Sequence, residues 1–327
     1  MMSWYHVSRC SFILNIILII VIIMLLVTQN NVKKEPLLFK PQYNKYHEAV
    51  SGDKSINTTR TLLTVTRERS VRILCVILTS PVNHLTKAVH VEATWGQRCH
   101  KMIFLTDTSS DQLPHNLTFI QLEDVRGREK LWYKVQLGMK EVWRRYKDDF
   151  DYLLKADDDT FIVMKNLISL LQSKQEDDFI LGHNQMVDGV SYHSGGSGYV
   201  MTHGAVKTIV EQGFREVNGN TLCDLPHQHG DEVNHYPNED LQMGSCASLL
   251  NIKILNSQVQ GQSTFFPFPF HTHLIQDLSN TWFINHTSEC SGSVDCVSPH
   301  VISLHYVDPQ TMYVLHFMTE VFKNNLL

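Results

Sequence analysis

Three consecutive carboxylates, Asp157, Asp158 and Asp159, interrupt an apolar stretch that runs from residue 150 to residue 163. The residues before them have the length of a buried strand, so the triplet is expected where that strand ends. Adjacent carboxylates repel one another unless a cation or a set of donors compensates their charge. Because ligands of open α/β sheets bind at the carboxyl ends of strands, the triplet predicts a divalent cation that neutralises a diphosphate leaving group. A solvated turn is the alternative, although such turns normally lie in polar sequence.

A second pair of carboxylates, Glu239 and Asp240, opens a predicted helix over residues 238–251. Asn238 is a good capping residue, and acidic side chains in a first turn interact favourably with the helix dipole. If the start of this helix faces the cleft, one of the two carboxylates can instead act as a general base. The residues alone leave both roles open.

Two further segments have residue types that suit binding. The glycines of SGGSGY, residues 194–199, lie between two strand-like pieces and permit close approach of backbone to a ligand, although a tight turn needs them equally. The polar segment 218–238 carries His227, His229 and His235. A solvated loop is favoured over a metal site there, because no second ligand set has regular spacing.

The segments that must position these residues alternate between strand-like and helix-like patterns. The Pro- and Phe-rich segment 264–274 is expected to be extended, because proline disrupts a helix. The alternation predicts an α/β fold with a mostly parallel sheet and helices on both faces. Besides the strand that leads into the acidic triplet, strands are expected at 71–80, 101–107, 179–183, 190–193, 199–202 and 301–309, the last ending at His305, and helices at 85–94, 129–147, 164–173, 238–251 and 310–322.

The N-terminal region contains a long apolar run, residues 12–27, in which Asn15 is the polar exception. Its length is at the short limit for a helix that spans a membrane. The next four residues, TQNN, provide no small-residue cleavage site, so an uncleaved anchor is favoured over a cleaved signal peptide. Residues 28–69 are polar without a sustained apolar period and are predicted to be a flexible stem. The predicted organisation is therefore a tail at 1–11, a membrane anchor at 12–27, a stem at 28–69 and a folded domain at 70–327.

Charge and modification signals indicate the class of protein and its compartment. The net charge of −5, without a basic block, argues against a nucleic-acid partner. Glycosylation sequons occur at Asn57, Asn116 and Asn285, all after the apolar run, as expected for a domain in a secretory lumen. Zinc is disfavoured, because no paired C-x-x-C spacing occurs. An even number of cysteines follows the run and can form disulfides, although spacing does not give the pairing: Cys75, Cys99, Cys223, Cys246, Cys290 and Cys296.

Five motifs resemble, in this order, those of the core 1 β1,3-galactosyltransferases, which are glycoprotein-N-acetylgalactosamine 3-β-galactosyltransferases. The resemblance extends from Val71 to the predicted C-terminal helix, and the ordered set is specific although each motif alone is weak. The motifs are TWG at 94–96, LKADDDT at 154–160, SGGSGYV at 194–200, EDL at 239–241 and SLHYVDPQTMY at 303–313.

This resemblance implies an A-type glycosyltransferase fold in the lumen of the Golgi, behind a single-pass type II membrane anchor, with a possible homodimer. It implies transfer of galactose from UDP-galactose to the 3-hydroxyl of GalNAc α-linked to Ser or Thr of a glycoprotein. The expected reaction inverts the anomeric centre and uses Mn²⁺. An imidazole among carboxylate ligands suits manganese better than calcium or magnesium.

The resemblance also assigns roles to residues of this chain. Asp240 is expected to be the general base, with Glu239 as the reserve candidate. For the cation it implies Asp157 and Asp159 as ligands with His305, and Asp159 is expected to touch the ion directly. For the donor it implies Asp157, Asp158, Asp159, Thr94, Trp95 and Gly96; for the acceptor, Gly195, Gly196 and Trp282, whose indole would stack on the sugar.

Two other functions are weighed against this one. The same family includes a non-catalytic chaperone for the transferase, but that relative lacks the acidic triplet present here. A β1,3-glycosyltransferase with another donor or acceptor, such as a fringe-like GlcNAc transferase, is the second alternative.

Overall fold

The computed structural model describes residues 70–107, 114, 116–174, 178–224, 238–275, 285–287, 289–290 and 293–322. The chain divides into two compact units, Met1–Thr66 and Arg67–Leu327, and the description below concerns the second. The predicted tail, membrane anchor and stem lie outside the described residues. Of the helices that are described, none combines the length and the apolar character that a membrane span needs.

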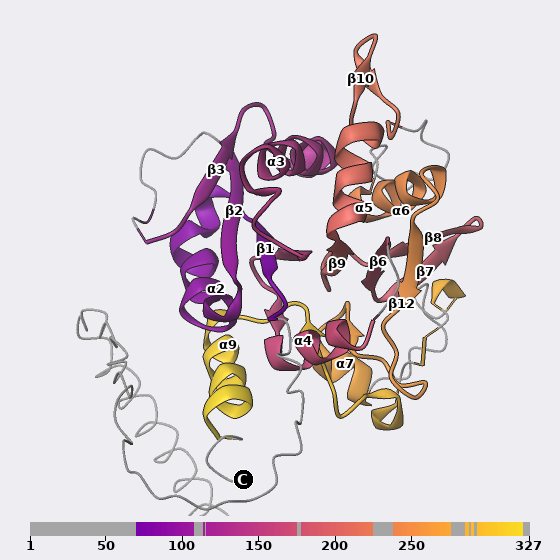
Figure 1. Ribbon diagram of the computed structural model, residues 1–327. Helices are drawn as coiled ribbons and strands as arrows, with labels where there is room; N and C mark the ends of the chain where they lie inside the picture. Colours follow the sequence, from indigo (N-terminus) through magenta and orange to yellow (C-terminus); the bar gives the residue numbers. More distant parts are fainter. Residues whose placement is uncertain are drawn as a thin grey trace, which may run out of the picture. The chain divides into compact units, whose positions relative to one another are not determined.

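A seven-stranded sheet organises the folded unit (Figure 1). Its pairs are parallel except that β9 runs antiparallel to both of its neighbours, β4 and β6. The predicted mostly parallel sheet is therefore confirmed. In spatial order the strands are β12 (Lys253–Asn256), β6 (Phe179–Gly182), β9 (Tyr199–Thr202), β4 (Tyr152–Asp157), β1 (Ile73–Leu78), β2 (Lys101–Asp107) and β3 (Phe119–Leu122).

Two apolar cores lie on opposite faces of this sheet. Strand β1 is buried throughout, and because successive side chains alternate between faces, Leu74, Val76 and Leu78 belong to one core while Ile73 and its alternate neighbours belong to the other. The first core is covered by α3 (Leu131–Tyr146), α5 (His203–Thr208) and α6 (Glu239–Leu249), and the second by α2 (Val89–Ala93), α4 (Met164–Gln172) and α9 (Pro309–His316).

A smaller three-stranded sheet joins distant parts of the chain near the acidic triplet. Strand β14 (Ser303–Leu304) pairs in parallel with β13 (Phe265–Phe266) and antiparallel with β5 (Phe161–Ile162). Leu304 lies opposite Phe161 in this register. Because β5 begins just after the acidic triplet and β14 ends just before His305, this pairing brings His305 to the carboxylates.

The remaining elements are short. Two hairpins are formed by β7 (Asn184–Val187) with β8 (Val190–His193) and by β10 (Glu216–Val217) with β11 (Asn220–Thr221). A short α7 (Phe270–Ile275) follows β13. Tight 3-10 turns are η1 (Pro81–Asn83), η3 (Trp95–Arg98), η4 (Arg128–Lys130) and η6 (Val294–Cys296), and wider π-helical turns are η2 (His84–Ala88), η5 (Ile209–Gly213) and η7 (Phe317–Phe322).

Some predictions about elements were wrong. The segment 264–274 is not extended throughout, because α7 begins at Phe270, after Pro269, the last proline of the run. The predicted strand 301–309 has only two residues in strand conformation, since Tyr306 adopts a positive φ of 57° that ends it. Strands β3 and β12 were not predicted at all.

The six cysteines after the apolar run form three disulfides, as their even number suggested. The pairs are Cys75–Cys99, Cys223–Cys246 and Cys290–Cys296, with Cα–Cα distances of 5.9, 5.0 and 5.1 Å. These distances are ordinary for disulfide-linked residues. The first pair ties β1 to the segment before β2, and the second ties the residues after β11 to α6.

Candidate active site

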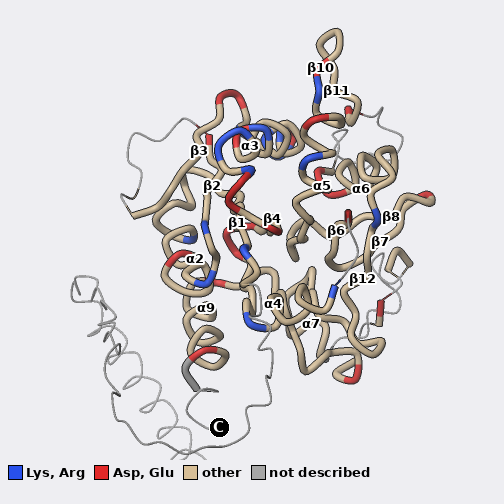
Figure 2. Tube along the Cα trace, in the orientation of Figure 1, with Lys and Arg blue, Asp and Glu red and all other residues tan. Residues whose placement is uncertain are grey.

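The acidic triplet lies where the sequence predicted it, at the end of a buried strand. β4 ends at Asp157, and a tight turn follows in which the Thr160 amide donates to the Asp157 carbonyl oxygen over 3.2 Å. The charge-coloured trace shows acidic positions beside β4 in the middle of the folded unit, with basic positions nearby (Figure 2). The strand end thus presents the carboxylates at the edge where open α/β sheets bind their ligands.

Asp157, Asp159 and His305 form a cluster that can hold a metal ion. Each offers one ligand atom, and the three atoms lie within 4.8 Å of one another. His305 Nδ1 lies 2.9 Å from the Pro267 carbonyl oxygen, to which it donates, so Nε2 is the ring nitrogen that faces the carboxylates and could ligate a metal ion. Nε2 lies 3.3 Å from Asp159 Oδ1. Two carboxylates and one oriented imidazole are a suitable donor set for a divalent transition metal, and the structure brings together all three residues that the resemblance implied.

The other carboxylate of the triplet has a different environment. Asp158 is buried and accepts a hydrogen bond from Thr79 Oγ1 over 2.8 Å. Burial raises the pKa of Asp158 to about 6, although the Thr79 hydroxyl and the Lys87 ammonium both oppose the shift. Asp158 therefore supports the turn from below and is not one of the residues that line the cavity described next.

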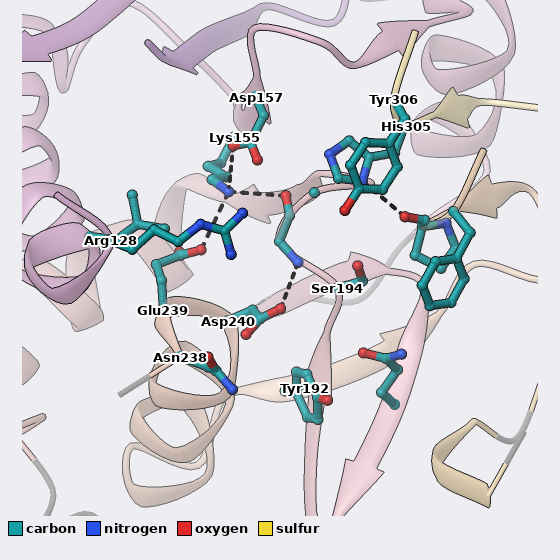
Figure 3. A pocket seen from close by; sticks show the side chains of 16 residues that line it. Arg128, Lys155, Asp157, Tyr192, Ser194, Asn238, Glu239, Asp240, His305 and Tyr306 are labelled. Carbon is teal, nitrogen blue, oxygen red and sulfur yellow. Dashed lines mark hydrogen bonds and ion pairs between the residues drawn. The ribbon is translucent and has the colours of Figure 1, made fainter. Parts of the chain in front are cut away.

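A cavity of about 360 Å³ lies beside the cluster (Figure 3). Its lining comes from β4, β8, the glycine-rich segment, the start of α6 and the segment around His305. Polar and aromatic side chains both contribute. The lining residues are Arg128, Leu131, Lys155, Asp157, Gln185, Tyr192, Ser194, Gly195, Gly196, Asn238, Glu239, Asp240, Pro267, Phe268, His305 and Tyr306.

Helix α6 points its first turn into this cavity, as the base hypothesis required. Asp240 Oδ2 accepts from the Gly195 amide over 3.0 Å, and Oδ1 accepts from the Leu241 amide over 2.9 Å. Burial raises the pKa of Asp240, while the Gly195 amide and the charge of Lys155 oppose the rise. Asn238 is the residue before the helix but its side chain makes no capping hydrogen bond, so the predicted cap was wrong in that respect.

Glu239 is more deeply buried than Asp240 and both of its oxygens are engaged. Oε1 accepts from the Tyr199 hydroxyl over 2.6 Å, and Oε2 lies 3.3 Å from Lys155 Nζ. Burial raises the pKa of Glu239, and the ammonium of Lys155 opposes this. These fixed contacts favour a positioning role for Glu239.

Lys155 is the functional residue that sequence reasoning missed. Its side chain is 4% exposed, and Nζ lies 3.0 Å from Asp157 Oδ1 and 3.3 Å from Glu239 Oε2, and donates to the Gly195 carbonyl oxygen over 3.0 Å (Figure 3). The neighbouring carboxylates raise its pKa against the effect of burial, so it is charged. The signal was present in the sequence: a lysine inside an apolar strand, two residues before the triplet.

Close packing around the glycine-rich segment explains why glycines occur there. A Cβ on Gly195 would lie 2.8 Å from Glu239 Oε2, and one on Gly196 would lie 2.0 Å from His305 Cε1. Gly195 contributes its carbonyl to Lys155 and its amide to Asp240, so one peptide segment connects the metal cluster with the candidate base. The glycines therefore permit close packing of the site, and both also line the cavity.

The TWG motif lies beneath the acidic turn and does not line the cavity. Trp95 is 1% exposed and its Nε1 donates to the Thr160 carbonyl oxygen over 2.9 Å. Thr94 is buried and bonds to the His90 carbonyl oxygen, and a Cβ on Gly96 would meet Met102 Sδ at 2.7 Å. In this structure these buried residues support the acidic turn, and their direct contact with the donor stays a prediction.

Some predicted residues cannot be placed. Trp282, Asn57 and the three histidines at 227, 229 and 235 lie outside the described residues. The other two sequon residues, Asn116 and Asn285, are both exposed, as a glycosylation site must be. The structure adds three aromatic residues, Tyr192, Phe268 and Tyr306, to the cavity lining; no periodic pattern in the sequence indicates them.

Comparisons with known proteins agree with the motifs. A family model described as Fringe-like matches residues 69–319. A Xenopus laevis protein, glycoprotein-N-acetylgalactosamine 3-beta-galactosyltransferase 1, is 30% identical over 256 residues; the match covers 76% of this chain and 66% of that protein, just under two thirds of its length. Human chondroitin sulfate synthase 2 is 26% identical over 134 residues, which cover 40% of this chain and 17% of that protein.

Among solved structures, a match is found to the galactosyltransferase LgtC in complex with donor and acceptor sugar analogs. The TM-score is 0.41 at 13% identity, over 77% of this chain and 94% of that one. The resemblance to the core 1 β1,3-galactosyltransferases is confirmed by the family match and the Xenopus relative. The chain therefore belongs to the Fringe-like family.

Proposed function

We propose that this chain is an inverting glycosyltransferase that moves galactose from UDP-galactose to the 3-hydroxyl of GalNAc α-linked to Ser or Thr. Membership of the Fringe-like family and the similarity to the Xenopus 3-beta-galactosyltransferase support the reaction class. The product would be the core 1 O-glycan of a glycoprotein. The luminal Golgi location behind a type II membrane anchor is part of the same proposal and rests on the apolar run and the sequons.

The observation that carries the proposal is the shared cavity. Asp157 and His305 of the metal cluster and the carboxylate of Asp240 all line it. Group transfer between sugars needs a way to neutralise the diphosphate leaving group and a base for the acceptor hydroxyl. This chain offers both on one surface, and the carboxylates come from separate elements, β4 and α6.

Asp157, Asp159 and His305 are the residues that would hold a divalent cation, which we propose to be Mn²⁺ because an imidazole joins the carboxylates. When bound, the ion would supply Lewis-acid stabilisation of the negative charge on the departing UDP. A carboxylate must be ionised to ligate a cation. The pKa of Asp159 lies at about 2, because donors from His305 and Lys87 outweigh the effect of burial, so this ligand is ionised at neutral pH.

Asp240 is better placed than Glu239 to be the base. Each of its oxygens accepts one backbone N–H, which orients the carboxylate and leaves further lone pairs for an acceptor hydroxyl. Its raised pKa favours proton uptake. In the proposed step the acceptor oxygen attacks the anomeric carbon opposite the leaving UDP as Asp240 takes the hydroxyl proton, so the anomeric configuration inverts.

A panel of donors and acceptors tests the proposal. The protein is incubated with UDP-galactose, UDP-GlcNAc, UDP-GalNAc or UDP-glucose and with a GalNAc-peptide or a fucosyl-peptide, with and without Mn²⁺. Turnover of UDP-galactose onto the GalNAc-peptide, dependent on the metal, is expected. Turnover with another donor would identify a different β1,3-transferase, and no turnover with any pair, together with absent UDP binding, would favour a non-catalytic relative.

A further inference from the structure

Lys87 contacts the acidic turn from η2, the π-helical turn that follows η1. Its Nζ lies 2.9 Å from Asp159 Oδ2 and 3.7 Å from Asp158 Oδ1. The side chain is 34% exposed, so the ammonium lies at the edge of the site and not within the core.

We propose that Lys87 is a binding residue for the diphosphate of the nucleotide donor. When the metal and the donor bind, its ammonium leaves the carboxylate of Asp159 and pairs with the diphosphate instead. This inference rests on the proposed function, since it concerns the same donor site. It assigns to Lys87 two effects of opposite sign, competition with the metal and attraction of the nucleotide.

The competition follows from charge and distance. Asp159 shares its carboxylate between His305 at Oδ1, 3.3 Å away, and Lys87 at Oδ2, 2.9 Å away. A divalent cation ligated by Asp159 would lie a few ångströms from the Lys87 ammonium and would repel it. The lysine therefore weakens binding of the metal alone, unless an anion lies between the two positive charges.

A diphosphate is such an anion. Phosphate oxygens are common ligands of divalent cations in nucleotide sites, and two oxygens on one cation lie only a few ångströms apart. A phosphate oxygen that joins Asp159 on the ion is thus within reach of Lys87 after a rotamer change. The resulting bond between ammonium and phosphate is charge-assisted, which makes it stronger than a neutral hydrogen bond.

Other nearby lysines are less able to move. Lys155 is 4% exposed and is held by two carboxylates and a carbonyl oxygen. Lys134 is buried as well and donates to the Thr79 carbonyl oxygen. Within the part of the chain that the structure describes, Lys87 combines contact with the triplet, partial exposure and a flexible stem.

Two affinities measured on the full-length chain in detergent test the inference. Binding of Mn²⁺ alone is followed by electron paramagnetic resonance of the free ion, and binding of UDP at saturating Mn²⁺ by calorimetry. In Lys87→Met, Mn²⁺ alone should bind at least about threefold more tightly, because a like charge is gone. UDP should bind about tenfold more weakly, because a charge-assisted bond is lost.

Two further variants make the result specific. Lys87→Arg keeps the charge and should bind UDP within about threefold of the unchanged protein. Lys140→Met removes another half-buried lysine, whose ion pair with Glu216 has the same length of 2.9 Å but lies on α3. It should leave both affinities unchanged, and thermal unfolding of each variant shows whether it is folded.

The outcomes separate this inference from the proposed function. Unchanged UDP affinity in folded Lys87→Met, or Mn²⁺ affinity that falls along with it, would overturn the inference while the unchanged protein still binds UDP. If the unchanged protein binds no UDP with Mn²⁺ present, the proposed function fails and the inference with it.

Discussion

Gly196 and His305 pack so closely that no side chain fits between them. A Cβ built on Gly196 would lie 2.0 Å from Cε1 of the imidazole and 2.4 Å from Nδ1. The ring cannot simply move away, because Nδ1 bonds to the Pro267 carbonyl oxygen over 2.9 Å. The glycine-rich segment therefore fixes the position of a candidate metal ligand from behind.

Replacement of Gly196 by alanine should weaken metal binding. The added methyl group has to displace the ring of His305 and break its bond to Pro267. Loss of such an orienting contact commonly costs about 10- to 100-fold in metal affinity, and that range is expected for Mn²⁺ here. Calorimetry of Mn²⁺ binding measures it.

Gly189→Asp is the matched control for Gly196→Ala. Gly189 lies between β7 and β8 at a φ of +82°, which Asp tolerates better than most residues, and nothing lies within 4 Å of a Cβ there. Metal affinity should stay unchanged in this variant. Equal affinities in Gly196→Ala and the unchanged protein would mean that His305 does not bind the metal.

Asp240→Asn should abolish turnover and preserve binding of the donor. The amide keeps one acceptor for the Gly195 N–H but cannot take the proton from the acceptor hydroxyl. Loss of a general base typically lowers the rate by about 10²- to 10⁴-fold. The measurement compares initial rates with the affinity for UDP in the presence of Mn²⁺.

Glu239→Gln separates the two acidic residues. The side chain can still accept from the Tyr199 hydroxyl, but its ion pair with Lys155 is lost, so the effect should be on stability more than on rate. A larger loss of rate in Glu239→Gln than in Asp240→Asn would transfer the base role to Glu239.

The sequence predicted the parts of the site that depend on local pattern. An apolar run with the triplet at its end determined both β4 and the position of the carboxylates, and the start of α6 followed from its polar first turn. These features need only a few neighbouring residues. The neighbourhood of His305 and Asp159 came from the resemblance, since β14 and β5 pair across about 140 residues and no spacing reveals such a contact.

What escaped prediction depends on tertiary packing. Lys155 is a charged residue within an otherwise apolar strand, and its three acceptors come from β4, α6 and the glycine-rich segment. Trp95 belongs to a motif that suggested ligand contact, yet its indole is fully enclosed under the acidic turn. A motif shows that residues occur together, whereas burial decides which of them can reach a ligand.

Two buried histidines should make the folded protein less stable in mild acid. Burial lowers the pKa of His193 and of His273 to about 4, from 6.5 in an unfolded chain. Between these values the unfolded chain binds protons that the folded protein does not, so stability is complete above pH 6.5 and falls as the pH decreases toward 4. Each histidine should account for about 3 kcal/mol over this window.

Urea unfolding at a series of pH values between 4.5 and 7.5 measures this slope. His193→Gln should make the curve flatter, because one of the two groups no longer titrates in the unfolded chain. His271→Gln, at an exposed position of α7, is the control and should keep the slope of the unchanged protein. An unaltered slope in His193→Gln would contradict the assignment.

The disulfide between Cys223 and Cys246 links stability to the position of the base. Both cysteines are fully buried, and Cys246 lies on α6, whose first turn carries Asp240. The bond closes a segment of 23 residues, so its removal by Cys223→Ala with Cys246→Ala should cost about 3 kcal/mol. The Cys290–Cys296 bond closes only 6 residues and should contribute about 2 kcal/mol.

Because α6 holds the base while the metal ligands come from the β4 turn and the segment after β14, loss of the Cys223–Cys246 bond should lower turnover more than Mn²⁺ affinity. Denaturant unfolding, rates and Mn²⁺ binding of both double variants measure these effects, and a parallel fall of rate and metal affinity would show that the bond supports the whole site and not the helix alone.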